Sequence, residues 1–354
     1  MTKVACILPS RIGDIVFSFP AIKSIKKSLK SAHITFFVDK RYKDLVDLNP
    51  NIDLVISYDF KLLKNPLNLF KAYKFFRNFN FNIAFDMQGY LKSSLVMLFI
   101  KAKYKFGTSP SPKEPAFLFS KFPYKYKEFE NVHRVDRHLF SLEKIFKDYL
   151  KIPFKKEVDF SYAFTQNEIE KIFSKLKFFF EKDKTYFLLF LGGGWISRRW
   201  GYKNYFYLSR KLQEKYGFIP VLVGGAPSGS PEEDEYINFI KLATKENLKF
   251  LNLYNQISLK EYIYLCKFSK DFNIKFFIGN DAGATHIAWS AGVYSFEILG
   301  PTSPEVVRPY INGEAIYKKV SCSPCRNRNC KLLLCMKNIK VKDVLNKIER
   351  FLNA

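Results

Sequence analysis

Apolar residues in the first half of the chain form short runs that alternate with segments of helical periodicity. Four of these runs predict buried strands, namely KVACILP (3–9), HITFFVD (33–39), DLVISYD (53–59) and NIAFDMQG (82–89). Helices are expected over 20–29, 61–79, 93–102 and 131–150, where apolar residues recur every three or four positions. Strands that alternate with helices predict β-α-β units and a parallel sheet.

The same pattern begins again in the second half. Strands are expected at TYFLLFLGGG (185–194), IPVLVGGAP (219–227), IKFFIGND (274–281) and VYSFEILGP (293–301), with helices at 202–217, 231–244 and 258–269 between them. A proline-rich segment at 107–127 and a linker at 151–165 interrupt the pattern. We therefore predict an α/β protein with two domains, residues 1–165 and 175–335, followed by a terminal helix at 338–354.

Composition excludes several classes of protein. The 354 residues are 47% hydrophobic, so the chain can bury a core, yet its longest apolar runs, such as 186–191, are too short to span a bilayer. The apolar stretch at 4–8 is too short for a secretory signal, and a cytoplasmic protein is expected. The net charge of +25 reflects either an anionic partner or a codon bias toward lysine. No nucleic-acid-binding module is recognisable, so no nucleic-acid partner is expected.

Four cysteines lie within fourteen residues near the end of the chain. Their spacing is C-x2-C-x4-C-x4-C, from Cys322 through Cys325 and Cys330 to Cys335. Four thiolates at such spacing can hold zinc or iron in a tetrahedral structural site. Reduced or packed cysteines are the alternative, and the sequence alone does not choose between them.

Three strand ends in the second half carry residues suited to a nucleotide diphosphate. GGGWISRRW (192–200) offers glycines, including Gly193 and Gly194, followed by two arginines. GGAP…EEDE (224–235) places carboxylates where they can bind a ribose, or simply complement a helix N-terminus. GNDAGATHIA (279–288) begins a helix whose free N–H groups can bind phosphate. The alternative for this last stretch is a capping Asp281 and a core His286.

Other nucleotide and hydrolase motifs are missing from the sequence. The first strand is followed by PSRIGD, which has a single glycine and not the GxGxxG of dinucleotide-binding proteins. The chain also has no GxxxxGK[ST] and no GxSxG segment. These absences argue against a nicotinamide cofactor, a phosphate-loop NTPase and an α/β-hydrolase.

Taken in order, the motifs resemble glycosyltransferase family 9, the heptosyltransferases of lipopolysaccharide inner-core synthesis. The resemblance runs from about residue 4 to residue 340 and rests on RIGDIVFSFPAIKSIKK, DMQGYLKSS, HRVDRHL, GGGWISRRW, LVGGAP, GNDAGATHIA, GPTSPEVVRPY and CSPC. It implies a GT-B fold, in which two Rossmann-like domains with parallel sheets face each other across a cleft. The acceptor would bind the N-terminal domain and the nucleotide sugar the C-terminal one, and the last helix would cross back onto the N-terminal domain.

The resemblance also assigns roles to residues. Asp14 matches the proposed general base of an inverting transfer, and Arg198 matches the basic residue that contacts the donor diphosphate. The residues that it places at the donor are Gly193, Gly194, Arg198, Arg199, Glu232, Asp281, Gly283, Ala284 and His286. Those that it places at the acceptor are Arg11, Gly13, Asp86 and Gln88. Fixed positive charge would neutralise the leaving diphosphate, so no cofactor is required for catalysis.

The function expected from this resemblance is transfer of a heptose from ADP-heptose to a lipopolysaccharide inner-core acceptor. The acceptor would be an anionic glycolipid at the cytoplasmic surface of the inner membrane, where basic residues of 101–127 could dock. Two departures affect the donor: Ala282 replaces the usual Ser or Thr, and Arg198 a frequent Lys. Two alternatives stay open, a related glycosyltransferase with another nucleotide sugar or a protein acceptor, and a non-catalytic GT-B protein that only binds a nucleotide sugar.

Overall fold

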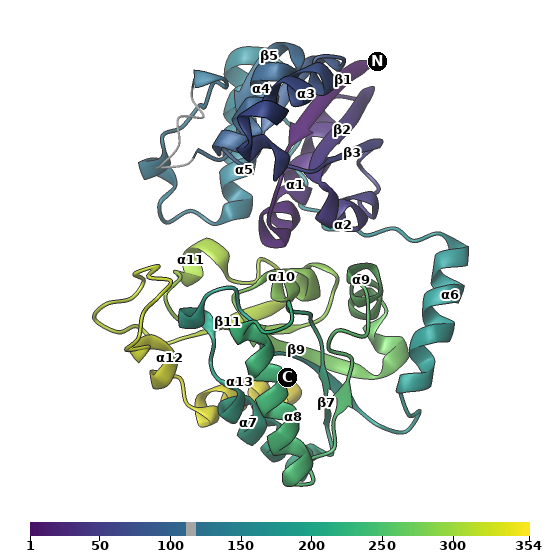
Figure 1. Cartoon of the computed structure of the whole chain (residues 1–354), viewed down its shortest axis with the longest axis vertical. Helices are drawn as coiled ribbons and strands as arrows, with labels where there is room; N and C mark the ends of the chain where they lie inside the picture. Colours follow the sequence, from purple (N-terminus) through teal and green to yellow (C-terminus); the bar gives the residue numbers. More distant parts are fainter. Residues whose placement is uncertain (111–117) are drawn as a thin grey trace. The chain divides into compact units, whose positions relative to one another are not determined.

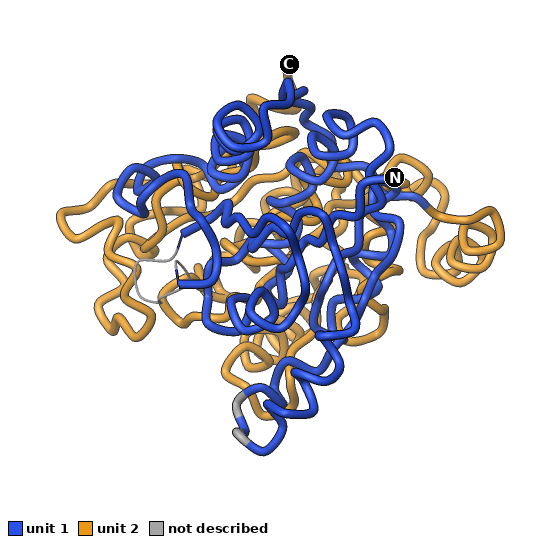
Figure 2. The backbone as a smooth tube through the Cα atoms, turned by 90° about the horizontal axis from the view of Figure 1, so that it is seen from above, with its two compact units in different colours: residues 1–163 blue, residues 164–354 orange. Residues whose placement is uncertain are grey.

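The computed structural model describes residues 1–110 and 118–354. The chain divides into two compact units, Met1–Ala163 and Phe164–Ala354, which Figure 2 shows in different colours. Each unit is an α/β structure with its own parallel sheet. Two sheets of this kind are what the alternation of strands and helices predicts.

Unit 1 is built on a five-stranded sheet in the order β3-β2-β1-β4-β5 (Figure 1). Its strands are β1 (Thr2–Ile7), β2 (Ala32–Asp39), β3 (Leu54–Tyr58), β4 (Asn80–Asp86) and β5 (Lys101–Gly107). Its helices are α1 (Ile12–Ser28), α2 (Lys43–Asp47), α3 (Pro66–Phe76), α4 (Leu91–Phe99) and α5 (Arg134–Lys144). The central strand β1 pairs in parallel with β2 and β4, so that Ile7 lies beside both Phe37 and Asp86.

Strand β5 differs from the prediction, which is a helix to residue 102 and a proline-rich segment from 107. The structure ends α4 at Phe99 and begins β5 at Lys101. The strand lies at the edge of the sheet and alternates lysines with aromatic and small residues. Charged residues are common on edge strands because they prevent pairing with other chains. The lysines of β5 interrupt the apolar run by which a strand is recognised in a sequence.

Two predicted helices are divided. The expected helix 61–79 is a 3₁₀ turn, Leu62–Lys64, followed by α3, with Asn65 accepting a hydrogen bond from the Leu67 N–H at 3.0 Å. Pro66 explains the break, since proline is favoured in the first turn of a helix but not in its interior. The expected helix 131–150 is α5 followed by a π-helical segment, Ile145–Leu150.

Unit 2 is built on a six-stranded sheet in the order β11-β10-β9-β6-β7-β8. Its strands are β6 (Tyr186–Phe190), β7 (Ile219–Leu222), β8 (Leu251–Asn252), β9 (Ile274–Asn280), β10 (Ser295–Leu299) and β11 (Gly313–Tyr317). Its helices are α6 (Gln166–Leu176), α7 (Tyr202–Tyr216), α8 (Pro231–Lys245), α9 (Leu259–Lys267), α10 (Gly283–Ser290), α11 (Pro304–Val307), α12 (Leu334–Asn338) and α13 (Val341–Leu352). The edge strand β11 was not predicted.

The terminal helix α13 packs within unit 2, which corrects the expectation that it lies on the N-terminal domain. Val344 and Ile348 are fully buried in the core of this unit, and the Phe351 ring stacks on Tyr294 with centroids 4.1 Å apart. The segment before the helix is also anchored there, since Trp200 donates its indole N–H to the carbonyl of Ile339 at 2.8 Å. Apolar residues of α13 complete the core of the second sheet.

None of the helices within the described residues is both long enough and apolar enough to cross a membrane.

Candidate functional site

The carboxyl ends of β6 and β9 are joined in unit 2 by one buried side chain. Asn280, the last residue of β9, donates its amide hydrogens to the carbonyls of Leu191 and Gly192 at 2.9 and 2.8 Å. Its Oδ1 accepts the N–H of Trp200 at 3.2 Å. The turns that follow these two neighbouring strands are therefore held side by side, where ligands bind in parallel sheets.

Arg198 and Asp281 form an ion pair across these two turns. Arg198 Nη2 lies 3.0 Å from Asp281 Oδ2, and the same guanidinium donates to the Asp281 carbonyl and to Thr302 Oγ1, both at 3.2 Å. Its carbon Cζ also lies 3.9 Å from the centroid of the Trp195 ring. Burial alone would raise the pKa of Asp281, but the charge of Arg198 and hydrogen bonds hold that pKa well below its usual range.

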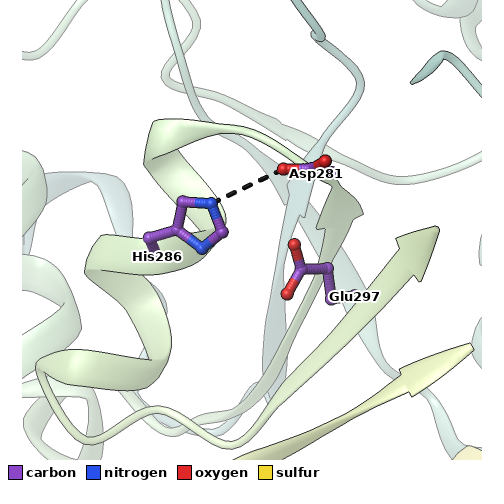
Figure 3. A group of neighbouring side chains, drawn as sticks. All are labelled: Asp281, His286 and Glu297. Atoms are coloured by element: carbon purple, nitrogen blue, oxygen red, sulfur yellow. Dashed lines mark ion pairs between the residues drawn. The ribbon is translucent and has the colours of Figure 1, made fainter. Parts of the chain in front are cut away.

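His286 approaches the same carboxylate from α10 (Figure 3). Its Nε2 lies 3.6 Å from Asp281 Oδ1, while its Nδ1 accepts the indole N–H of Trp289 at 3.3 Å. A nitrogen that accepts carries no proton in the neutral ring, so the hydrogen bond from Trp289 places the ring proton on Nε2, toward Asp281. The alternative interpretation of His286 from the sequence is a core histidine. It is buried, and it also faces the carboxylate.

A second acidic side chain, Glu297 of β10, completes this cluster of three and was not predicted. Asp281, His286 and Glu297 are all buried, and one ligand atom from each lies within 4.8 Å of the others (Figure 3). Neither carboxyl oxygen of Glu297 has a hydrogen-bond partner within the described residues. Burial and the charge of Asp281 raise the pKa of Glu297 well above its ordinary value, although Arg198 acts in the opposite direction.

The N-terminus of α10 adjoins the cluster. The helix begins at Gly283, and Ala282 at the cap position has no side-chain hydrogen bond to its first turn. The hydroxyl of Tyr262 donates to the Ala284 carbonyl at 2.9 Å and supports this turn from α9. An eight-residue helix whose first N–H groups lack a side-chain cap can bind an anion, and Gly283 and Ala284 lie where such a ligand would bind.

In the glycine turn after β6, the most closely packed glycine is Gly192 and not the predicted Gly193 or Gly194. Glu232 Oε1 accepts the Gly193 N–H at 2.9 Å, and a Cβ on Gly192 would lie 2.0 Å from that oxygen. A Cβ on Gly194 would meet nothing within 4 Å, so the close approach falls on Gly192. Arg199 donates to the carbonyls of Gly193 and Pro231 at 3.0 and 2.6 Å and thus ties this turn to α8. Burial raises the pKa of Glu232.

In unit 1, Asp14 lies in the first turn of α1 and forms an ion pair with Arg134 of α5 through Oδ1. Both side chains are partly exposed, at 14% for Asp14 and 22% for Arg134. The residue before the helix, Arg11, has a positive φ of 76°, which turns the chain sharply between β1 and α1. The motif HRVDRHL was noticed in the sequence, but nothing in the local pattern showed that its arginine pairs with Asp14.

His138, on the same helix as Arg134, is buried beside this pair. Its Nδ1 lies 2.8 Å from Thr108 Oγ1, and burial lowers its pKa to about 4, with the Asp14 carboxylate opposing that shift. The imidazole is therefore neutral at physiological pH. Arg134 remains the cation that is paired with Asp14.

Asp86 and Gln88 follow β4, the neighbour of β1. Asp86 Oδ1 accepts the N–H groups of Gln88 and Gly89 at 3.0 and 2.8 Å, and burial raises its pKa to about 6. Gln88 Nε2 donates to the carbonyl and hydroxyl of Ser10 at 2.9 and 3.0 Å. These bonds tie the end of β4 to the segment that carries Arg11, Gly13 and Asp14. The structure thus gathers the predicted acceptor residues at one edge of the unit 1 sheet.

The four clustered cysteines do not form the predicted metal site. All are free thiols; Cys322 and Cys325 are exposed, Cys330 is half-buried and Cys335 is buried. Among the described residues, no three of the four sulfur atoms come within the 4.8 Å of one another that a shared ion requires. The expectation of a structural zinc or iron at these cysteines is therefore unsupported.

The family follows from comparison with known sequences. The sequence model of glycosyltransferase family 9 (heptosyltransferase) matches residues 69–335, well over half of the chain. The chain belongs to glycosyltransferase family 9. This family 9 enzyme is 26% identical over 364 aligned residues to lipooligosaccharide heptosyltransferase 2 of Campylobacter jejuni subsp. jejuni serotype O:2, with 99% of this chain and 98% of that protein covered.

Solved structures show the same fold as this family 9 chain. ADP-heptose lipopolysaccharide heptosyltransferase II of E. coli aligns with a TM-score of 0.76 at 17% identity, over 98% of both chains. The E. coli heptosyltransferase WaaC with ADP-2-deoxy-2-fluoro heptose aligns with a TM-score of 0.69 at 18% identity, over 99% of this chain and all of that one. With the two parallel sheets, these likenesses confirm the predicted α/β, GT-B fold class.

Proposed function

We propose that this glycosyltransferase moves a heptose from ADP-heptose to an acceptor sugar of the lipopolysaccharide inner core. The relatives named above act on lipooligosaccharide or lipopolysaccharide, and the names of the two solved structures include ADP-heptose or its fluoro analogue. The observation that carries the proposal is the ion pair of Arg198 with Asp281 beside the uncapped start of α10. Such an arrangement suits a diphosphate.

In this mechanism unit 2 holds the donor. Arg198 and the first N–H groups of α10 neutralise the diphosphate as it leaves with the electrons of the bond to the anomeric carbon. Asp281 is itself anionic, so its role is to orient Arg198 and the Nε2–H of His286 and not to contact phosphate directly. Glu232, at the start of α8, would accept hydrogen bonds from the donor ribose.

Unit 1 supplies the base. Asp14 takes the proton of the acceptor hydroxyl as its oxygen forms the new bond to the anomeric carbon, with inversion of configuration. The ion pair with Arg134 engages Oδ1, which leaves Oδ2 as the proposed proton acceptor. Arg11, Gly13, Asp86 and Gln88 would contact the acceptor from the same edge of the sheet.

The donor can be tested by binding and by transfer. Thermal unfolding of the full chain is measured with ADP-heptose, UDP sugars and GDP sugars, and transfer is followed on a heptose-deficient lipopolysaccharide acceptor. We expect stabilisation by ADP-heptose alone, accompanied by transfer of heptose. Stabilisation by a UDP or GDP sugar with no effect of ADP-heptose would contradict the proposed donor. Donor binding without transfer or donor hydrolysis would favour the non-catalytic alternative.

We also propose that the enzyme works at the cytoplasmic face of an anionic membrane and docks through unit 1. The first expected docking region, 101–127, is described only in part, because 111–117 lie outside the described residues. Within it, the β5 residues Lys101 and Lys103 are exposed. Helix α3 adds a second basic surface, since no acidic residue occurs between Asp59 and Asp86.

The outer face of α3 combines this charge with exposed apolar side chains. Leu67 is 82% exposed and Phe70 62%, and Lys71 and Lys74 are exposed beside them. The Lys74 ammonium lies 4.5 Å from the centroid of the Phe70 ring. Exposed apolar side chains among lysines are typical of helices that lie in the interface of an anionic bilayer, where each cation contributes about 1 kcal/mol.

Vesicle sedimentation tests this surface. We expect the full chain to bind vesicles with an anionic lipid and not neutral ones, with affinity that falls as salt is added. The double variant Lys71→Glu/Lys74→Glu should bind at least about tenfold more weakly, given about 1 kcal/mol for each cation removed. The control Lys211→Glu/Lys245→Glu reverses two exposed charges of unit 2. Equal losses in the two variants would show that only net charge matters and would contradict docking by α3.

A further inference from the structure

One buried acid beside the donor site has no role in the mechanism above. Glu297 occupies the middle of β10, between Phe296 and Ile298, in a strand that is otherwise buried and largely apolar. Its side chain is fully buried, and both of its carboxyl oxygens lack a hydrogen-bond partner among the described residues. An ionised carboxylate in such a place is very unfavourable unless it is paired.

The groups that face Glu297 come from three elements. Asp281 directly follows β9, and His286 projects from α10 (Figure 3). Arg198 comes from the turn after β6. Only Arg198 among them is a permanent cation, and its guanidinium lies 3.0 Å from the Asp281 carboxylate. The charge of Arg198 is thus balanced by one carboxylate, and a second carboxylate has no cation of its own.

We propose that Glu297 is a positioning residue of the donor-phosphate site, where it acts as an uncharged acid beside the Asp281–His286 pair and keeps the site receptive to a diphosphate. The inference rests on the proposed function, because it takes the diphosphate of ADP-heptose as the ligand of this edge. It draws support from the raised pKa of Glu297, whose causes are burial and the Asp281 charge.

The physical reason is the balance of charge at the edge of the sheet. With Glu297 uncharged, Arg198 and Asp281 cancel, and the N–H groups that begin α10 leave the site slightly positive. With Glu297 ionised, a second negative charge lies within 4.8 Å of Asp281 and opposes an incoming phosphate.

Calorimetric titration with ADP tests the proposal on the full chain, from about pH 7 to about pH 9.5, above the ordinary range of a glutamic acid. We expect the wild-type affinity to fall by about tenfold or more across this range as Glu297 ionises. Glu297→Gln cannot ionise and retains a hydrogen-bond donor, so its affinity should stay nearly constant. Glu297→Met, which also carries no charge, should likewise keep a nearly constant affinity across this range.

A matched control separates this effect from general loss of charge. Glu305→Gln removes an acid of α11 that is exposed to solvent, and it should follow the wild-type profile. Parallel profiles for wild type and Glu297→Gln would overturn the proposal. Tighter ADP binding with Mn²⁺ or Zn²⁺, lost in Glu297→Gln, would overturn it too, because a metal and not a proton would then neutralise the cluster. Failure of wild type to bind ADP at about pH 7 would instead contradict the proposed function.

Unfolding gives a second readout that does not depend on the ligand. All three tryptophans, Trp195, Trp200 and Trp289, lie in unit 2, so tryptophan fluorescence follows the unit that holds Glu297. An acid whose pKa is raised by folding stabilises the fold at low pH, and this contribution is lost as the pH rises. Glu297→Gln should therefore unfold at higher urea than wild type at about pH 8, with a smaller difference at about pH 5. No difference at either pH would contradict an uncharged Glu297.

Discussion

Each unit has a buried aspartate at or directly after the end of an inner strand. The pKa values of these two aspartates are shifted in opposite directions. Asp86, at the end of β4 in unit 1, has its pKa raised to about 6 by burial, although N–H groups of Gln88 and Gly89 stabilise its charge. Asp281, directly after β9 in unit 2, is equally buried, yet its pKa lies well below its usual range. The largest difference is the guanidinium of Arg198, 3.0 Å from Asp281 Oδ2, and hydrogen bonds add to its effect.

This contrast shows what a single cation does at the edge of a parallel sheet. Neutral hydrogen-bond donors do not offset the burial of Asp86, whereas the charge of Arg198, together with His286 and the hydroxyl of Thr302, reverses the effect of burial at Asp281. Unit 2 therefore carries a fixed arrangement of charge that suits a diphosphate. Unit 1 carries a carboxyl group that changes its charge near neutral pH, close to the proposed base Asp14.

The largest expected effect tests whether proton transfer belongs to unit 1. Asp14→Asn removes the proposed base and should lower the transfer rate about 10²- to 10⁴-fold, the usual contribution of a general base. The affinity for ADP should stay at its wild-type value, because the proposed donor residues lie in unit 2. Steady-state transfer and ADP calorimetry provide the two measurements.

Asp44→Asn is the control for Asp14→Asn, since Asp44 also lies in the first turn of a unit 1 helix but is exposed. The transfer rate and the ADP affinity of Asp44→Asn should both match those of the wild type. An Asp14→Asn enzyme with unchanged turnover would remove Asp14 from the mechanism. Loss of ADP binding in Asp14→Asn would show that donor binding is not confined to unit 2, and would contradict the proposed separation of donor binding from proton transfer.

The next largest effect is expected when a substitution removes the cation that distinguishes Asp281 from Asp86. Arg198→Met leaves the Asp281 carboxylate buried without its partner, which should lower the free energy of unfolding of unit 2 by about 3 kcal/mol. Urea unfolding followed by tryptophan fluorescence reports on this unit, and ADP binding should be lost at the same time. Adding Asp281→Asn should restore part of the stability but not the binding, because the buried charge is gone and the cation is still missing.

An exposed ion pair provides the matched control for Arg198→Met. Arg210 pairs with Glu246 at 3.2 Å, with side chains that are 33% and 38% exposed. Arg210→Met should change the stability of unit 2 by less than about 1 kcal/mol, as expected for a pair that water screens. If the two variants lost equal stability, burial would not be the reason why the Arg198 pair matters.

A third effect concerns Asp86 and depends on pH. Its folded pKa of about 6 lies above the ordinary value of 3.8, so the folded state holds the proton more tightly than the unfolded state. The stabilising contribution is complete below about pH 4 and is lost as the pH rises to 6 and beyond. Asp86→Asn does not titrate, and its Oδ1 can still accept the N–H groups of Gln88 and Gly89.

We therefore expect Asp86→Asn to stabilise unit 1 at about pH 8, by up to about 3 kcal/mol for a shift of roughly two pKa units. At about pH 4 the variant and the wild type should be equally stable. Amide hydrogen exchange of β1 and β4 measures this in unit 1, which has no tryptophan. Destabilisation at pH 8 would mean that the charged form of Asp86 is the one that the fold prefers.

The sequence predicts the fold well because both sheets have apolar central strands. Strands such as β1 and β6 are buried along nearly their whole length, so their apolar runs stand out. The edge strands β5 and β11 were missed for the opposite reason: KAKYKFG and GEAIY carry charged or half-exposed residues and lack a clear apolar run. The terminal helix was recognised, but its amphipathic pattern does not say which sheet it covers.

The candidate site shows a similar limit. Local motifs mark the turns that carry Asp14, Arg198 and Asp281, because glycines and charges cluster where strands end. Partners from distant segments have no local signal: Arg134 joins Asp14 across 120 residues. Glu297 is a single acid within the apolar strand SFEIL, and only the structure places it against Asp281.

The smallest expected effect tests how far the Arg198–Asp281 ion pair depends on the hydrogen bond between Arg198 and Thr302. Thr302 Oγ1 accepts a hydrogen bond from Arg198 Nη2 at 3.2 Å, and its side chain is buried. Thr302→Val keeps the shape and removes the hydroxyl, which should weaken ADP binding by about fivefold to tenfold, the value of roughly one buried hydrogen bond. Thr302→Ser retains the hydroxyl and should bind ADP like the wild type. If valine and serine weakened binding equally, packing by the methyl group would matter and the hydroxyl would not. If neither did, the contacts of Arg198 with Asp281 and Trp195 would hold the guanidinium without the hydroxyl of Thr302.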